Sequence, residues 1–197
     1  MNRFSSLSNP TLRDLSLRGT LLVASPNVST GPWQRAVCLL VHHSEQGAIG
    51  VCLNRTIQSS PKFWKELFGL SSEKLTPKSL HFGGPQAGPV VAIHDCQEFA
   101  EYTGGDGVYV AAQVASLRSL VSKTEAEVRI FVGQANWGPG QLEQELGDEI
   151  WLPVPVSPQI VFADEQKMWV QAMRIIANSF VARICGVKIV PNSIFDN

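Results

Sequence analysis

The sequence contains no long hydrophobic run. The first apolar stretch, Leu21–Ala24, is far shorter than the about 20 residues of a membrane helix, and the polar segment Met1–Leu17 before it has no signal-peptide core. An excess of basic charge is also lacking, because 16 Lys and Arg face 17 Asp and Glu and the basic residues are scattered singly. We therefore expect no membrane span and no export signal, and nucleic acid is not a favoured partner.

Closely spaced cysteines are absent too, so the chain has no CxxC motif of a redox or zinc site. The cysteines are far apart and lie in or beside apolar segments, which is typical of reduced thiols in a core. A reduced set of this kind favours a cytoplasmic location. The four are Cys38, Cys52, Cys96 and Cys185.

Motifs of the common catalytic sites are missing. The sequence has no GxSxG elbow, no SxxK and no GxxxxGK[ST] phosphate loop. Its histidines show no ligand spacing, and the neighbours His42 and His43 would point to opposite faces of a strand. Glu143 and Glu145 are two residues apart on an expected helix, which favours a solvated surface over a catalytic pair. We expect no metal site and no cofactor, and an enzyme is not favoured.

The residues that are present predict an α+β fold. With 197 residues, of which 44% are hydrophobic, the chain is long enough for one core. We expect a polar tail over residues 1–17 and a single domain over residues 18–197. Strands and helices alternate unevenly, unlike the regular pattern of a parallel α/β sheet.

Apolar runs bounded by Gly, Pro and Asn predict strands, and the four-residue connection Ser44–Gly47 predicts a hairpin. A helix is expected between a Ser60 cap and Gly69, and the glycines over Gly104–Gly107 predict a turn. Trp151–Val156 is interrupted by prolines and is expected at a sheet edge. The other expected strands are Gly19–Ser25, Ala36–His43, Ala48–Asn54, Leu80–Phe82, Val90–His94, Val108–Val110, Val128–Val132 and Val187–Val190, and the other expected helices are Ala115–Lys123, Gln141–Leu146 and one capped by Asp164.

A Gly-rich turn over Asn136–Gly140 precedes an expected helix and leaves two interpretations open. Gly138 and Gly140 would let the backbone approach a ligand, and the helix N–H groups that follow would favour a phosphate or carboxylate. Alternatively, Trp137 fills the core and the glycines only make a tight turn. Gly83-Gly84-Pro85 has the same two interpretations.

Several blocks of the sequence, taken together, resemble the AlgH/YqgE-like family of bacterial proteins. The blocks are Gly19–Pro26, Arg35–Val37 leading to His42, Gly47–Val51 through Asn54-Arg55, Gly83–Pro85 and Trp137–Glu143. The similarity spans about residues 17–177. It implies an α+β fold in which a bifurcated mixed β-sheet folds into a pseudo-barrel with flanking helices. Members usually carry an arginine shortly after Gly-Gly-Pro, whereas this chain has Gln86–Pro89.

The family has no established activity, although some members are labelled transcriptional regulators. The leading hypothesis is a non-enzymatic binding or regulatory module for a small ligand or a protein partner. A transcriptional regulator acting on DNA and a hydrolase or metal enzyme are the alternatives. The candidate ligand-binding residues are Arg35, His42, Asn54, Gly83, Gly84, Trp137, Gly138, Gly140 and Gln141.

Overall fold

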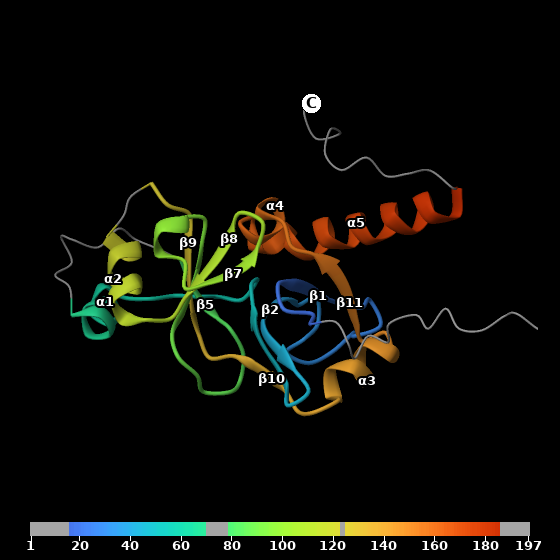
Figure 1. The fold of residues 1–197 in the computed structure, drawn as a ribbon, viewed down its shortest axis with the longest axis horizontal. Coiled ribbons are helices and arrows are strands. Elements are labelled where there is room, and N and C mark those ends of the chain that lie inside the picture. Colours follow the sequence, from blue (N-terminus) through green and yellow to red (C-terminus); the bar gives the residue numbers. More distant parts are fainter. Residues whose placement is uncertain (1–15, 70–78, 123–124, 186–197) are drawn as a thin grey trace, which may run out of the picture.

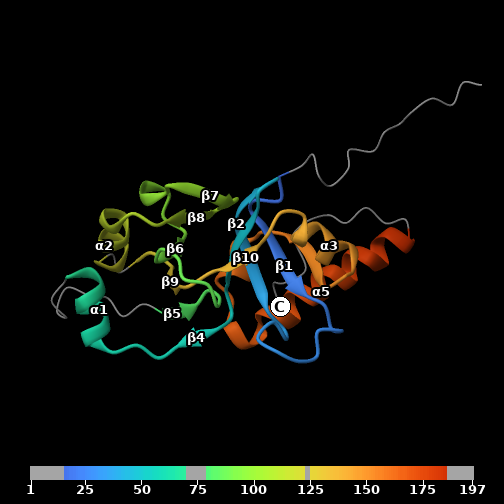
Figure 2. The ribbon, with the colours of Figure 1, turned by 90° about the horizontal axis from the view of Figure 1, so that it is seen from below.

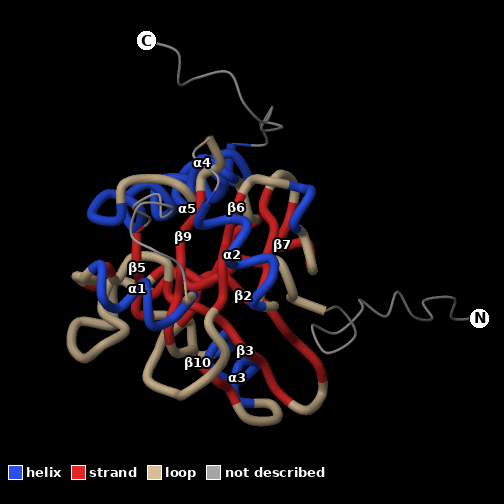
Figure 3. The backbone as a smooth tube through the Cα atoms, turned by 90° about the vertical axis from the view of Figure 1, so that its left-hand side faces the viewer, coloured by secondary structure: helices blue, strands red, loops and turns tan. Residues whose placement is uncertain are grey.

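The computed structural model describes residues 16–69, 79–122 and 125–185, and in them the chain forms two β-sheets with helices around them (Figure 1). Figure 3 shows the strands gathered in the middle and the helices outside them. This arrangement confirms the α+β class. Within the same residues, no helix is both long and apolar enough to span a bilayer. The strand expected over Val187–Val190 lies outside the described part of the chain.

The first sheet has five antiparallel strands in the order β10-β3-β2-β1-β11. The expected hairpin joins β2 to β3, with Ser44 opposite Gly47. Strand β11 lies at the edge, as its prolines predict. The strands are β1 (Thr20–Ala24), β2 (Val37–Ser44), β3 (Gly47–Cys52), β10 (Ala135–Trp137) and β11 (Trp151–Pro155).

The second sheet has six strands in the order β4-β5-β9-β6-β8-β7. Only the β5 and β9 pair is parallel among the strands described here. All six strands come from residues 56–132, so the whole sheet is inserted between β3 and β10, which are neighbours in the first sheet. The strands are β4 (Thr56–Ile57), β5 (Ser79–Phe82), β6 (Val91–His94), β7 (Tyr102–Gly105), β8 (Val108–Ala111) and β9 (Val128–Val132).

Helices α1, α2 and α3 cover outer faces of the sheets, whereas α4 and α5 pack against the cluster that the two sheets share. Figure 2 shows α1 and α2 at the end of the molecule formed by the second sheet, and α3 and α5 beside the first sheet. Helix α1 begins and ends as expected, because the Ser60 hydroxyl accepts the Phe63 N–H and Gly69 adopts a left-handed conformation. The helices are α1 (Pro61–Phe68), the 3-10 helix η2 (Gln97–Phe99), α2 (Val114–Ser122), α3 (Gln141–Gly147), α4 (Pro158–Val161) and α5 (Glu165–Cys185).

The buried side chains form three clusters, separated by the sheets. Strand β1 shows the alternation, because Leu21 lies in the cluster shared by the two sheets and Leu22 in the cluster beneath α3. Met168 brings α5 into the shared cluster, and Phe68 brings α1 into the third cluster, on the outer face of the second sheet. Each sheet thus takes part in the shared cluster, and each helix longer than one turn packs into one of the three clusters.

Two of the expected turns are partly strand. Asn136 and Trp137 belong to β10, so the turn is confined to the residues that follow them. Gly105 likewise belongs to β7, where a Cβ atom would lie 1.6 Å from the Val156 side chain. The glycine is needed in this strand because Val156 packs directly over its backbone.

Candidate functional site

The structure places the nine sequence-predicted site residues in separate parts of the molecule. Arg35 and Asn54 line a surface pocket, and His42 is exposed on β2 with its Nε2 atom 3.2 Å from the Ser44 hydroxyl. The two glycines of the Gly-Gly-Pro segment lie where two chain segments cross. The remaining four residues, Trp137, Gly138, Gly140 and Gln141, run from the end of β10 to the first residue of α3.

The turn before α3 is held together by the carboxylate of Glu145. Its Oε2 atom accepts the indole N–H groups of Trp137 and Trp151, both at 2.8 Å, and its Oε1 atom accepts the Gln141 amide at the same distance. Trp137 is only 6% exposed and Trp151 only 2%. Glu145 was expected on a solvated surface, and this is wrong, because the carboxylate satisfies two buried donors.

The same contacts favour the packing interpretation of this turn. The Gly138 N–H donates to Oε1 of Gln141 at 3.0 Å, so this donor does not face a ligand. Gly140 is the N-cap of α3 with φ of 73°, a conformation that glycine adopts without strain. The glycines thus let the backbone turn directly from β10 into the helix.

His43, which follows the predicted His42, makes the more specific contacts. Its Nδ1 atom accepts the Leu17 N–H at 3.0 Å, so the ring proton is on Nε2, which donates to Glu143 Oε1 at 2.8 Å. Glu143 was also expected to be merely solvated, and this too is wrong. No sequence pattern indicates this pair, because the two residues are 100 positions apart.

The Gly83-Gly84 segment crosses the segment that joins β9 to β10. A Cβ atom at Gly83 would lie 2.3 Å from the Gly133 carbonyl oxygen, and one at Gly84 would lie 2.3 Å from the Gln134 backbone. Gln86 and Gln134 then pair through their backbones. These glycines allow two main chains to pass in contact where the chain moves between the sheets.

The pocket that contains Arg35 and Asn54 has a volume of about 480 Å³ and lies between the segment before β2, the turn after β3 and the first turns of α5. Arg35 is exposed, and its guanidinium carbon lies 5.5 Å from the centre of the Trp169 ring, in the geometry of a cation–π contact. The Trp169 indole N–H donates to the Ala24 carbonyl at 2.8 Å, which fixes the ring.

Asn54 and Arg55 hold the backbone on which Arg35 is placed. Asn54 Nδ2 donates to the Arg35 carbonyl at 2.8 Å, and Asn54 Oδ1 accepts the Val37 N–H at 3.1 Å. The Arg55 guanidinium donates to the carbonyls of Pro32 and Gln34. Arg35 itself has φ of 54°, which is uncommon for a residue other than glycine and is found at functional sites more often than elsewhere.

A charge cluster forms part of the pocket wall, because Glu165 lines the pocket while its partners His81 and Arg129 are buried. Glu165, the first residue of α5, contacts His81 on β5 at 3.0 Å and Arg129 on β9 at 3.5 Å. Burial raises the pKa of Glu165, but the His81 hydrogen bond and the Arg129 charge outweigh it, so the pKa is lowered and the carboxylate is ionised. Burial lowers the pKa of His81, which favours the neutral imidazole.

Because Glu165 is matched by Arg129, the guanidinium groups of Arg35 and Arg55 leave the pocket with an excess of positive charge. Trp169 lies in the helix expected after the Asp164 cap, and sequence reasoning missed its part in this pocket. The sequence did indicate that Arg55 could belong to the site, because Arg55 follows Asn54 in one of the blocks that resemble the family.

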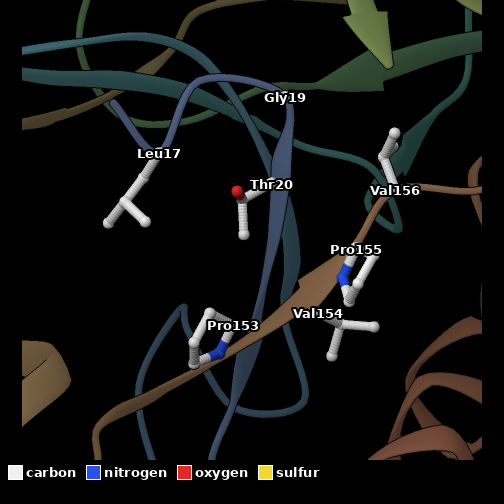
Figure 4. Close-up of a pocket in the computed structure, with 7 residues that line it drawn as sticks. All are labelled: Leu17, Gly19, Thr20, Pro153, Val154, Pro155 and Val156. Atoms are coloured by element: carbon white, nitrogen blue, oxygen red, sulfur yellow. The ribbon is translucent and has the colours of Figure 1, made fainter. Parts of the chain in front are cut away.

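A second pocket, of about 470 Å³, runs along the edge strand β11 (Figure 4). It is lined by Leu17, Gly19, Thr20 and the segment 153–156, none of which carries a charged side chain. Elsewhere in the described residues, no three His, Cys, Asp or Glu side chains gather in a way that would hold a metal ion. The pocket at Arg35 is therefore the better candidate for recognising a polar ligand.

Comparison with known proteins identifies similar chains. A family model described as AlgH-like matches residues 21–180. A UPF0301 protein from Chlamydia felis is 29% identical over 187 residues, which cover 91% of this chain and 95% of that protein. A UPF0301 protein from Streptomyces avermitilis is 33% identical over 177 residues, with coverages of 81% and 86%.

Two solved structures share the fold. The solution structure of the AlgH protein from Pseudomonas aeruginosa superposes with a TM-score of 0.65 at 23% identity, covering 94% of this chain and all of that one. The crystal structure of a protein from Corynebacterium diphtheriae gives a TM-score of 0.63 at 24% identity, with coverages of 87% and 90%. At this identity the similarity establishes the architecture.

Proposed function

The chain belongs to the AlgH-like family, and from that premise we propose that it is a binding module that takes a small anionic ligand in the pocket at Arg35 and Trp169. The observation that carries this proposal is the Arg35 guanidinium, which is exposed and rests on the Trp169 ring. No carboxylate among the described residues forms an ion pair with it.

The chemistry of the pocket suits a carboxylate or phosphate group. A guanidinium presents planar N–H donors that match the oxygens of either anion, and the aromatic face beneath it limits its orientations. The pocket volume lies within the range of about 300–1,000 Å³ that is usual for small-molecule sites. The excess positive charge then favours an anion over a neutral ligand.

The same geometry favours binding over catalysis. His81, which contacts the lining residue Glu165, is fully buried and directs Nε2 towards that carboxylate. A general acid or base must reach the proton that it transfers, and this ring is separated from the pocket by the Glu165 carboxylate. We propose that the His81 cluster fixes the start of α5, and with it Trp169. The free thiols favour a cytoplasmic location for this activity.

A titration followed by NMR tests the proposal. Inorganic phosphate, succinate and a neutral amide such as acetamide are added separately to the ¹⁵N-labelled full chain. We expect saturable shifts at the Arg35 amide and the Trp169 indole with at least one anion and none with acetamide. Arg35→Ala should weaken binding by about tenfold to a hundredfold, because a charge-assisted hydrogen bond contributes about 1.5–3 kcal/mol.

Arg174→Ala is the matched control, because Arg174 is exposed on α5, the helix that carries Trp169, and its loss changes the net charge as much as the loss of Arg35 does. Its affinity should stay within about twofold of the wild type. The proposal is wrong if neither anion gives saturable shifts, or if the Arg35 and Arg174 variants lose affinity equally.

A further inference from the structure

Cys38 and Cys52 face each other across β2 and β3. The two residues are direct partners in the strand register. The adjacent pair is hydrogen-bonded, because the Leu53 N–H donates to the Val37 carbonyl at 2.7 Å, so the cysteines occupy a non-hydrogen-bonded position. At such positions the Cα atoms lie about 4.5 Å apart, which is within the range that a disulfide spans.

The two thiols are already in contact on one face of the sheet. Both side chains belong to the cluster beneath α3, and a hydrogen bond joins them. The Cys52 S–H donates to Asn54 Oδ1, with a distance of 3.5 Å between sulfur and oxygen. Hydrogen bonds thus run from Cys38 to Cys52 and from Cys52 to Asn54. The Asn54 amide is itself held in place by the backbones of Val37 and Arg35.

The surroundings distinguish the two sulfurs. The hydrogen bond from Cys38 lowers the pKa of Cys52, burial opposes this, and the Arg55 charge lowers it further. The hydrogen bond with Cys52 is the largest cause that raises the pKa of Cys38, and burial raises this pKa further. Cys52 is therefore the thiol that ionises first and would attack an oxidant, and Cys38 is the thiol that would then attack the oxidised Cys52 sulfur.

We propose that Cys38 and Cys52 are an oxidative modification site that closes to a cross-strand disulfide in response to hydrogen peroxide. The Cys52 thiolate attacks the O–O bond, which breaks to give a sulfenic acid and, with one proton, water. The Cys38 thiol then attacks the Cys52 sulfur, so that the S–O bond breaks, the S–S bond forms and a second water leaves. Two thiols lose two electrons and two protons, and the peroxide is reduced to two waters.

Access to the pair lies at the end of β3. Cys38 and Cys52 are almost fully buried, but Cys52 is the last residue of its strand and is followed by the turn that carries Asn54 and Arg55 beside the pocket. Local opening of this turn admits a molecule as small as hydrogen peroxide. We expect oxidation to be slower than at the exposed Cys185 but to give one defined product.

The test uses the full chain carrying Cys96→Ser and Cys185→Ser, treated with hydrogen peroxide while folded. The peroxide is removed with catalase, the protein is unfolded, and free thiols are alkylated with iodoacetamide for mass spectrometry. We expect both alkylation sites to disappear together with the loss of two hydrogen atoms. A non-reducing peptide map should link residues 38 and 52, and dithiothreitol should restore both sites.

Cys38→Ala in the same background is the control, and it should give oxidised Cys52 without an internal link. If circular dichroism shows that this variant is unfolded, the peptide map of the wild-type chain decides, because the folded chain should give the 38–52 link and the urea-unfolded chain a mixture. The inference is overturned if both thiols of the test chain stay alkylatable after a peroxide treatment that oxidises Cys185 in the wild-type chain. Sulfinic acid at Cys52 without a linked peptide overturns it equally. Neither outcome depends on the ligand proposed above.

Discussion

Replacement of Glu145 by alanine is expected to destabilise the fold more than any exposed substitution. The carboxylate accepts three hydrogen bonds of 2.8 Å, two of them from the indoles of Trp137 and Trp151. A hydrogen bond to a charged group contributes about 1.5–3 kcal/mol, and a buried donor without a partner costs about 1–3 kcal/mol. Because Glu145 is half-buried and water reaches part of the site, we expect the free energy of unfolding to fall by about 3 kcal/mol.

Glu145→Gln should cost less, about 1 kcal/mol, because the amide oxygen still accepts the indole protons while its NH₂ group opposes that of Gln141. Urea unfolding followed by circular dichroism measures both values, with an unchanged m-value as the sign that only stability has changed. Glu66→Ala is the control, since this carboxylate is 68% exposed and its loss should cost under about 0.5 kcal/mol.

A double-mutant cycle assigns the effect to the indole contact. Trp151→Phe removes one N–H donor, and its cost should shrink by about 1–2 kcal/mol when Glu145 is already alanine. A coupling near zero, or a Glu145→Ala cost equal to that of Glu66→Ala, would refute the conclusion that this carboxylate holds the turn together.

Two further predictions concern the chain crossing and the buried histidines. Gly84→Ala should lower the free energy of unfolding by more than about 2 kcal/mol, because the φ of Gly84 is 152° and the added Cβ would meet the Gln134 backbone. Gly138→Ala is the control, since its Cβ has space, and it should cost under about 1 kcal/mol in the same urea assay. Equal costs of the two substitutions would contradict this prediction. Burial lowers the pKa values of His81 and His94 below 6.5, so between the folded-state pKa and 6.5 the unfolded chain binds more protons. The free energy of unfolding should therefore fall as pH is lowered through 6.5, which urea unfolding from pH about 7.5 to about 5.5 measures. The variant His42→Gln, at an exposed position, should keep this slope. A free energy of unfolding that stays constant or rises over this range would argue against the prediction.

Elements defined by local chemistry could be predicted from the sequence. Helix α1 is an example, because its Ser60 cap, its proline and its final Gly69 are all within ten positions of one another. Strand β10 could not be predicted, since three residues are too few to show a period of two and Trp137 was assigned to the turn. The same limit applies to β4, which has only two residues.

Only some residues of the candidate pocket could be predicted from the sequence, because the others come from a distant segment. Arg35 and Asn54 belong to blocks that resemble a family, and the structure does place them together. Trp169 and Glu165 join them from more than 100 positions further along the chain. Their own segment shows only a helical stripe, because the contact that matters is set by the packing of α5 against β1 and not by local sequence.

The insertion of the second sheet between β3 and β10 has a consequence for the order of folding. Residues 56–132 supply every strand of that sheet, whereas Gly50 of β3 must find Ala135 of β10 across the whole inserted segment. Loop closure over such a distance is entropically costly until the segment has compacted. We expect pulsed hydrogen exchange during refolding to protect Ile93 and Ile130 before Gly50, and simultaneous protection would contradict that order.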